Sequence, residues 1–358
     1  MSWLDWYLTA IVFAFGAVVG SFLNVCIHRL PRGRSIVSPP SHCPRCKQPI
    51  RWSDNIPIVS YVLLRGRCRY CQERISPRYV IVEALTAVFF VAVWWRETGW
   101  MVPIYWLFIA GLIVATFIDF EHYIIPDEIT LGGCAAGVAL AAVYPSLMQE
   151  SVWYRGLGFS VLGLVAGGAI VFAIVEVGKL IFGKRKIRLP PATEVRVADG
   201  RLWVGDENMR WEDLFMRPSD RVEFKAESVE LAGQQFANVW VQISETHVET
   251  AGQSYPLAQA VPIRARTDLL VIPQEAMGFG DVKLMAAVGA FLGWKAVLFV
   301  LMLSSMLGAL VGVILIALRL REMRGRIPYG PYIAAAAVVW VFYGQEILNW
   351  YHGWLERG

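Results

Sequence analysis

The sequence predicts an α-helical polytopic membrane protein with about eight transmembrane helices, a small cytoplasmic zinc-binding segment and a cytoplasmic β-rich insert. Three observations predict this class. The chain of 358 residues is 56% hydrophobic, its apolar residues lie in long runs, and one stretch, 184–270, departs from that pattern. Soluble domains contain about 45–50% apolar residues. The excess therefore indicates membrane spans rather than a larger core.

Eight apolar runs are expected to cross the membrane, each near the length that a bilayer requires. The first lacks basic residues before it and is longer than the apolar region of a signal peptide, so we expect it to be retained. Its small residues Gly16, Gly20 and Ser21 favour close approach of another helix. The sixth is short and is interrupted by Gly289 and Gly293, which indicates a partial or tilted span. The expected spans are 6–27, 79–95, 101–118, 129–147, 156–182, 282–293, 295–318 and 329–348.

The distribution of basic residues predicts the orientation of these spans. The segment 28–78 is rich in Arg and Lys but contains only two acidic residues, Asp54 and Glu73. Because such segments remain in the cytoplasm, the N-terminus is expected outside. The formal net charge of +4 gives no indication of nucleic-acid binding. Eight spans place three further stretches inside, and the last two begin with basic residues: 119–128, 183–281 and 319–326.

The stretch 184–270 is expected to fold as a small β domain. Apolar and polar residues alternate in short runs separated by turn signals, as in strands with one buried face. It carries no catalytic constellation, so we expect a structural or docking role. The alternating runs are 194–197, 201–204, 221–225 and 239–243, and the turn signals lie at 198–200 and 232–234.

These patterns divide the chain into five regions. Two of them are expected to hold the catalytic acids, and one is expected to hold a metal. The regions are the first transmembrane helix at 1–27, the basic zinc-binding segment at 28–78, helices two to five at 79–183, the β-rich insert at 184–270, and helices six to eight at 271–358.

Two acids at the membrane edge are the leading candidates for catalysis, because carboxylates near the hydrocarbon core are costly and commonly functional. Asp119 is expected at the cytoplasmic end of the third span and Asp281 at the cytoplasmic start of the sixth. They therefore lie at one depth on one side of the membrane. Two carboxyl groups that share a proton can act as general base on a water and general acid toward a leaving group. The pair predicts an intramembrane aspartic peptidase.

Taken singly, each of these acids has another interpretation. Asp119 is compatible with a solvated acid at the interface, and Asp281 is compatible with a helix N-cap. Gly278 and Gly280 are expected to let the backbone turn tightly and a substrate strand approach closely. Lys283 is expected either to bias the local charge or to extend to the interface.

Other polar residues nearby have interpretations that do not involve catalysis. Asp127 follows Pro126 and precedes an apolar run, so we expect it to be an N-cap. Glu128 suits the first turn of the same helix, where the dipole favours negative charge. Glu121 and His122 are expected to face the loop and water.

Four cysteines form two CxxC pairs, Cys43 with Cys46 and Cys68 with Cys71. Each pair can supply two ligands from one turn, and two pairs suffice for tetrahedral Zn²⁺. The expected cytoplasmic location argues against disulfides, although a redox role is the alternative. All four coordination positions would be filled, so the metal is expected to be structural.

The sequence resembles the type IV prepilin leader peptidases, which are GxGD-type intramembrane aspartic peptidases. The resemblance covers nearly the whole chain in order except the insert 184–270. It is carried by the two CxxC pairs and by the segments 20–31, Ser76–Tyr79 with Glu83, Asp119–Asp127, Glu275–Leu284 and Ile327–Pro331.

This resemblance implies an enzyme of the bacterial inner membrane that acts at the cytoplasmic face. It would cut prepilins or type II secretion pseudopilins after a glycine, with Asp119 and Asp281 as catalytic acids. It also implies N-methylation of the new N-terminus with S-adenosylmethionine. Asn24, Arg29 and Glu83 match patterned positions and are the methyltransferase candidates. Residues that would support the substrate or the loops are Gly278, Gly280, Lys283, Asp127 and Glu121.

Two other classes of function remain open from the residues. Broken spans and membrane acids also fit a proton-coupled transporter, although the acids are expected at one membrane edge and no inverted repeat is apparent. A non-catalytic assembly factor could use the zinc segment and the β domain for docking. The expected partners of the enzyme are the prepilins or pseudopilins and membrane lipid.

Overall fold

The computed structural model describes residues 2–198, 200–205, 207–215, 220–231, 233–273, 278–318 and 328–355. The chain forms two compact units, one comprising Met1–Phe172 with Gly278–Gly358 and the other Ala173–Met277. The expected basic loop 319–326, and residues 275–277 of the motif that precedes Asp281, lie outside the described residues.

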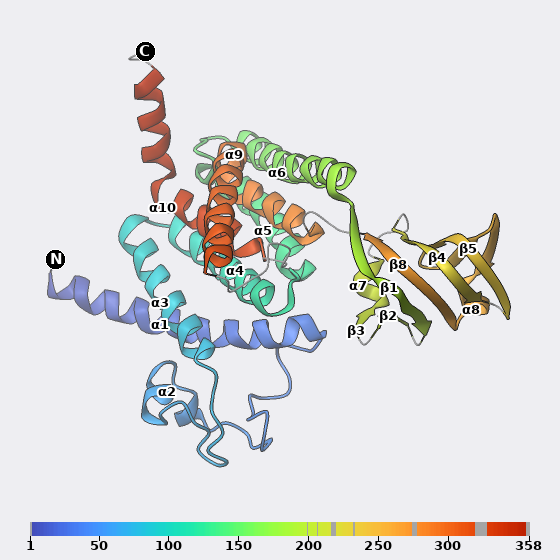
Figure 1. Cartoon of the computed structure of the whole chain (residues 1–358). Coiled ribbons are helices and arrows are strands. Elements are labelled where there is room, and N and C mark those ends of the chain that lie inside the picture. Colours follow the sequence, from blue (N-terminus) through green and yellow to red (C-terminus); the bar gives the residue numbers. More distant parts are fainter. Residues whose placement is uncertain are drawn as a thin grey trace. The chain divides into compact units, whose positions relative to one another are not determined.

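The first unit is helical (Figure 1). Its long helices lie close to the ranges expected for the membrane spans. Short helices follow the first of them, in the segment that carries the cysteine pairs. The elements are α1 (Trp3–Arg29), η1 (Leu30–Arg32), η2 (Trp52–Asn55), α2 (Val59–Leu63), α3 (Arg78–Arg96), α4 (Met101–His122), α5 (Asp127–Val143), η3 (Pro145–Met148), α6 (Trp153–Phe182, which continues into the second unit), α9 (Phe279–Ala317) and α10 (Gly330–Leu355).

Six helices in the described part of the chain are long and apolar enough to cross a membrane, namely α1, α3, α4, α6, α9 and α10. The polytopic class is therefore confirmed, while the expected number of eight is not. Two differences account for this. The helix α5 is short, with 17 residues. The expected sixth and seventh spans both lie in α9, which bends at Gly293.

The helix α9 is broken in the middle at Gly293, whose φ of 79° and ψ of 171° are not helical. The expected interruption is wrong at Gly289, which is helical, but it is confirmed at Gly293. Glycine adopts positive φ without the steric cost that a Cβ imposes, so the sequence can change direction here. The part before the break is buried over most of its length.

The helices α1 and α3 lie side by side (Figure 1), and small residues allow their close contact. A Cβ placed on Gly16 would lie 2.7 Å from Cα of Ala87, and one on Gly20 would lie 2.7 Å from Cα of Glu83. The expectation that these two glycines permit close approach is therefore confirmed. Both helices also pack on α4 around fully buried side chains, including Ile27, Val82 and Ile109.

The second unit contains one eight-stranded sheet in the order β3-β2-β1-β8-β4-β5-β6-β7, which confirms a β-rich insert. All its pairings are antiparallel. The first and last strands of the insert pair with each other, so the chain enters and leaves it at neighbouring positions. The elements are β1 (Lys184–Ala198), β2 (Arg201–Val204), β3 (Glu207–Arg210), α7 (Trp211–Leu214), β4 (Val222–Leu231), β5 (Gln234–Ile243), β6 (His247–Thr250), β7 (Gln253–Pro256), α8 (Leu257–Ala260) and β8 (Ile263–Pro273).

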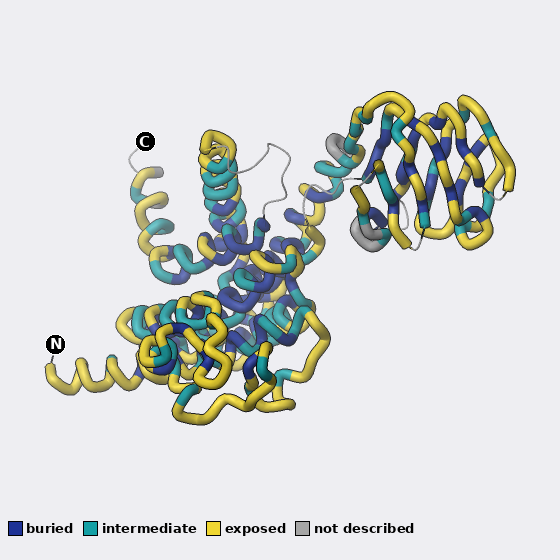
Figure 2. The backbone as a smooth tube through the Cα atoms, turned by 60° about the horizontal axis from the view of Figure 1, so that its bottom comes forward, coloured by how far each residue is buried: buried dark blue, intermediate teal, exposed yellow. Residues whose placement is uncertain are grey.

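Buried and exposed residues alternate along the strands of the insert (Figure 2). This period of two is the pattern of strands with one buried face. Leu202, Phe224, Ile243, Val248 and Leu270 are fully buried and belong to one apolar cluster. The insert thus has a hydrophobic core of its own.

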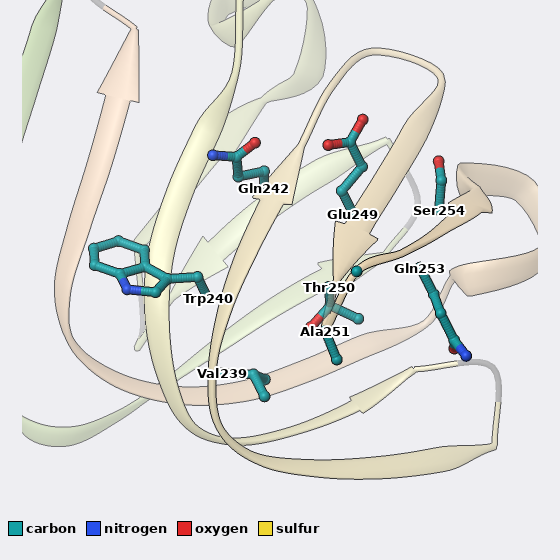
Figure 3. Close-up of a pocket in the computed structure, with 9 residues that line it drawn as sticks. Val239, Trp240, Gln242, Glu249, Thr250, Ala251, Gln253 and Ser254 are labelled. Atoms are coloured by element: carbon teal, nitrogen blue, oxygen red, sulfur yellow. The ribbon is translucent and has the colours of Figure 1, made fainter.

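A hollow of about 440 Å³ opens on the insert, between β5 and the hairpin of β6 and β7 (Figure 3). Trp240 on its rim is 53% exposed. One of the lining residues is charged, Glu249, and its carboxylate lies 3.6 Å from the guanidinium of Arg221. The hollow therefore presents no pair of acid and base groups.

Candidate active site

Asp119 lies in the last turn of α4 and is 6% exposed. The helix ends at Tyr123, which adopts the left-handed conformation and donates its N–H to the carbonyl oxygen of Asp119 at 2.9 Å. The side-chain Oδ2 of Asp119 accepts a hydrogen bond of 2.9 Å from the N–H of Gly330. A carboxylate of one helix is thus held by the first residue of α10.

Asp281 is the third residue of α9 and is 7% exposed. Gly278 occupies the N-cap position, and its carbonyl oxygen accepts the N–H of Asp281 at 3.1 Å. The alternative in which Asp281 is itself an N-cap is therefore wrong. Its side chain remains in the first turn, where the helix dipole favours negative charge.

Ile125 connects the two acidic segments. A Cβ on Gly280 would lie 3.2 Å from Cβ of Ile125, and one on Gly330 would lie 3.1 Å from its Cδ1. Ile125 is therefore packed between the backbone beside Asp281 and the backbone that binds Asp119. The two carboxyl groups are close enough for their charges to interact.

The geometry of this site suits two carboxyl groups that share one proton. Both acids are buried, and neighbouring carboxylates cannot easily ionise together at low dielectric. The first residues of α9 and α10 lie at the pair, and the partial positive charge of a helix N-terminus stabilises a single negative charge. Such a pair can provide a base and an acid at the same time.

Of the two glycines before Asp281, only Gly280 provides space for a close contact. The φ of Gly278 is −69°, and Gly280 is helical, so neither lies in the left-handed region. Neither position therefore uses the positive φ that glycine tolerates best. Gly280 instead permits the contact with Ile125, whereas a Cβ on Gly278 would meet the carboxylate of Asp281 at an ordinary 3.6 Å.

Two ion pairs lie near the acidic segments. Lys283 binds Asp127 with Nζ to Oδ1 at 2.6 Å, and Arg78 binds Glu121. The expectation that Asp127 is an N-cap is wrong, because Pro126 occupies that position and Asp127 begins the helix α5. Glu121 is exposed, as expected, but its interaction with Arg78 was not visible from the sequence.

The four cysteines of the CxxC pairs form one cluster, although they come from two turns. Their sulfur atoms all lie within 4.8 Å of one another. Sγ of Cys43 is 3.8 Å from Sγ of Cys71, and Sγ of Cys46 is 4.0 Å from Sγ of Cys68. A zinc tetrahedron with bonds of about 2.3 Å has sulfur–sulfur edges of about 3.8 Å. These two distances are close to that edge, so the cluster could hold Zn²⁺.

Hydrogen bonds at the cluster favour the thiolate of Cys68, whereas at Cys71 a hydrogen bond from Glu73 is outweighed by desolvation and the neighbouring thiols, which raise the pKa of the Cys71 thiol to about 11. Backbone N–H groups of the second CxxC turn, at Cys71 and Tyr70, lower the pKa of the Cys68 thiol to about 7. Arg69 makes a two-pronged ion pair with Asp54, with distances of 2.8 and 2.6 Å, which lowers the pKa of that carboxyl. Arg45 lies 3.7 Å from Glu73. The basic residues of this segment are thus partly paired with its two acids.

Comparison with known sequences identifies the family. Residues 14–97 match the bacterial peptidase A24 N-terminal domain, and residues 106–187 and 245–313 match the type IV leader peptidase family. The chain is 30% identical to the prepilin leader peptidase/N-methyltransferase of Aeromonas hydrophila, over 97% of this chain and 95% of that protein. The chain belongs to the type IV leader peptidase family. This family comprises aspartic peptidases.

Other type IV leader peptidases show the same similarity. The prepilin leader peptidase/N-methyltransferase of Aeromonas salmonicida strain A449 is 29% identical over 97% of this chain and 95% of that protein. The protein of the same name from Myxococcus xanthus is 32% identical over 85% of this chain and 62% of that protein. No solved structure matches the chain. The family match is interrupted over 188–244, which lies within the insert.

Two of the methyltransferase candidates, Arg29 and Glu83, join the transmembrane helices to the cysteine-bearing segment. Arg29 donates to the carbonyl oxygens of Ser35 and Pro39, at 2.9 and 2.6 Å. Glu83 accepts the N–H of Ile58 at 2.7 Å. These contacts fix the segment on α1 and α3.

Asn24 differs from Arg29 and Glu83 because its side-chain oxygen has no hydrogen-bond partner in the described part of the chain. Its amide nitrogen donates to the carbonyl oxygens of Gly20 and Tyr79, at 3.3 and 3.0 Å. Its Oδ1 is buried and has no hydrogen-bond partner among the described residues. A buried acceptor without a donor is costly, so this atom is suited to an incoming cationic or N–H-bearing group.

Two residues of the aspartate site were not singled out from the sequence. Gly330 lies in a segment that only the family resemblance noted, and Ile125 appeared to be an ordinary apolar residue before Pro126. The one signal was the sequence Tyr-Gly-Pro at 329–331 directly before an apolar run, which marks a helix start. That signal says where a helix begins but not which side chain its N–H will bind.

Proposed function

We propose that this protein removes the leader peptide of type IV prepilins or type II secretion pseudopilins and methylates the N-terminus that is exposed. Cleavage would occur after a glycine, at the cytoplasmic face of the bacterial inner membrane, with the N-terminus of the enzyme outside. One observation carries the peptidase part. Asp119 and Asp281 are both buried, and Ile125 packs against the backbone beside Asp281 and against the backbone that binds Asp119.

The proposed reaction uses a water molecule held between the two acids. The ionised carboxyl takes a proton from this water, and the resulting hydroxide attacks the carbonyl carbon of the scissile glycine. The tetrahedral intermediate then breaks its C–N bond as the protonated carboxyl donates to the departing amine. The proton that the base removed restores the starting state of the pair, which titrates as a unit.

The surroundings of the pair support this chemistry. Burial excludes bulk water and strengthens the electrostatic interactions in the site. The apolar N-terminal helix of a pilin would lie among the spans. Because Glu121 and Asp127 each have a cation beside them, Glu128 and anionic lipid headgroups are the proposed attraction for a basic leader.

For methylation, we assign the methyl donor to the region of the zinc-bearing segment. S-Adenosylmethionine supplies an electrophilic methyl group on a positively charged sulfur. The free Oδ1 of Asn24 and the carboxylate of Glu83 are acceptors that suit such a cation. Arg29 would support the site by holding the segment in place, and Zn²⁺ on the four cysteines would stabilise its fold.

For the insert, we propose an influence on which prepilins are cut. It interrupts the part of the chain that matches the family, it has its own core, and it has no acid–base pair in its hollow. These features suit recognition or restriction of access rather than chemistry.

The experiment that tests the proposed function follows the mass of a prepilin. Purified protein in detergent is incubated with a prepilin and S-adenosylmethionine, and the products are weighed by mass spectrometry. The expected result is a fragment without its leader and with one added methyl group. An unchanged prepilin, with correctly inserted enzyme, would contradict the peptidase function, and leader loss without a methyl group would contradict the second activity.

A further inference from the structure

We infer that Gly330 is a positioning residue for catalysis, because its N–H holds the carboxylate of Asp119 and its missing side chain leaves room for it. This inference rests on the proposed peptidase function. It concerns the first turn of α10, a helix that carries neither of the two acids.

Among Gly330, Pro331, Tyr332 and Ile333, a single N–H is available for a group outside the helix. Helices begin with four N–H groups that have no partner within the helix. Here Pro331 has no N–H, and the N–H groups of Tyr332 and Ile333 bond to the carbonyl oxygen of Tyr329, at 3.0 and 3.3 Å. The remaining donor is Gly330, and it bonds to Oδ2 of Asp119.

The absence of a side chain at position 330 matters for space and not for backbone conformation. Gly330 is not among the glycines with positive φ, so an alanine could adopt its backbone angles. Its Cβ, however, would lie 2.8 Å from Oδ2 of Asp119. The collision can be relieved only if the carboxylate or the start of α10 moves, and either movement disturbs the hydrogen bond.

The residue before Gly330 anchors this turn to α9. The hydroxyl of Tyr329 lies 2.8 Å from the hydroxyl of Ser304 and 3.0 Å from that of Ser305. The part of α9 after the break at Gly293 therefore holds Tyr329, the residue directly before the N–H donor that binds Asp119.

Among the described residues, the charged groups near this arrangement are Asp281 and two ion pairs. On α9, Asp281 interacts electrostatically with Asp119, and Lys283 is paired with Asp127 of α5. Arg78 of α3 is paired with Glu121 of α4, so each ion pair contains one positive and one negative charge. Without this N–H, the negative charge of Asp119 would be stabilised less. The protonated form of its carboxyl group would therefore be favoured.

The test compares Gly330→Ala with Gly353→Ala, using the full-length protein and a synthetic prepilin peptide in detergent. Gly353 lies in the same helix, and a Cβ there would meet no atom within 4 Å. In Gly330→Ala we expect kcat to fall about tenfold to a hundredfold with little change in KM, as for a misplaced catalytic group. We expect Gly353→Ala to match the wild type in both constants.

The pH dependence of cleavage separates positioning from a general loss of structure. In Gly330→Ala the limb of the profile that Asp119 controls should move by about one unit to higher pH, because a carboxylate that loses a hydrogen bond is protonated more easily. The acid limb moves if Asp119 is the base, and the alkaline limb moves if it is the acid. A lower kcat with both limbs unmoved would overturn the inference, as would a wild-type kcat.

Tyr329→Phe provides a second variant in case Gly330→Ala does not insert. It removes the hydroxyl that bonds to the two serines and retains the ring, so we expect the same limb to move by less. An unmoved profile in Tyr329→Phe would then overturn the inference. Failure of the proposed function is distinguishable, because in that case the wild type would not cleave the peptide either.

Discussion

The cysteine cluster and the aspartate site are assembled in different ways. Cys43 and Cys71, which face each other, are 28 residues apart in one segment. The hydrogen bond between Asp119 and Gly330 joins residues 211 apart, and Asp281 comes from a third helix. The cluster depends on two local turns, whereas the aspartate site depends on the packing of α4, α9 and α10.

This difference predicts how the two sites fail. Loss of a cysteine should remove the metal and disturb its own segment, but leave the helical packing that holds the acids. A disturbed helix contact should damage cleavage even when the change is far from either acid. The following predictions test that separation, from the largest expected effect to the smallest.

The first prediction concerns the cysteine cluster. In a Cys43→Ser, Cys46→Ser double variant, bound zinc should be lost, because two of four tetrahedral ligands are removed. Methylation should fall more than about tenfold, as for the loss of metal-site ligands, while the rate of leader cleavage stays close to that of the wild type. Zinc is measured by elemental analysis, and both reactions are followed by mass spectrometry.

The control for this variant is Cys134→Ser, which alters a cysteine of α5 outside the cluster. It should retain zinc and methylation. Parallel loss of cleavage and methylation in the double variant, in protein that is correctly inserted, would show that the two sites are not separate.

The second prediction concerns helix packing in the unit that holds the acids. A Cβ on Gly163 of α6 would lie 2.1 Å from the carbonyl oxygen of Gly289 in α9. Gly163→Ala should therefore destabilise the protein by roughly 1–3 kcal/mol, as overpacking does, and reduce cleavage. Thermal unfolding in detergent and the cleavage rate are measured together.

Gly158→Ala on the same helix is the matched control, because a Cβ there would meet no atom within 4 Å. It should leave both quantities unchanged. Equal stability of the two variants would contradict the close contact between α6 and α9.

The third prediction concerns the insert. Arg188 and Leu269 are paired across β1 and β8, so residues 189–268 can be replaced by the two-residue turn Asn-Gly, which suits a hairpin. The shortened protein should keep its zinc, and the relative cleavage rates of different prepilins should change by several-fold, a difference of about 1 kcal/mol. Unchanged rates and substrate range would remove the proposed role of the insert.

The smallest effect is expected for the ion pair between Lys283 and Asp127, whose side chains are 25% and 58% exposed. Exposed ion pairs contribute about 0–1 kcal/mol. Lys283→Met should therefore change the cleavage rate by less than about fivefold, measured with the same prepilin. A much larger loss would show that Lys283 takes part in catalysis, and that the two acids are not its only participants.

The same difference in assembly explains how much the sequence could predict. Spacing within one segment specified the cysteine cluster, and apolar runs specified the helices, because both depend on local pattern. The expected membrane side and depth placed Asp119 and Asp281 at one membrane edge. They did not predict how near the two carboxyl groups would lie to each other. Alternation also predicted the β character of the insert.

What escaped prediction depends on contacts between distant elements. The binding of Asp119 by Gly330 requires the start of α10 to meet the end of α4. The partner of Asp127 is Lys283, on another helix, and Pro126 rather than Asp127 occupies the N-cap of α5. The break at Gly293 was expected, and it separates the two helical stretches of α9 near the boundary of the expected spans 282–293 and 295–318.

The central claim is that Asp119 and Asp281 act together in cleavage, and substitution of each by asparagine tests it most directly. Asparagine retains the size of the side chain but can neither take nor share the proton. Cleavage of a prepilin by Asp119→Asn and by Asp281→Asn should fall by more than about a thousandfold, as for the loss of a member of a catalytic unit. Asp127→Asn, an acid near the same site, should stay within about fivefold of the wild type. Substantial cleavage by either of the first two variants, in correctly inserted protein, would contradict the account.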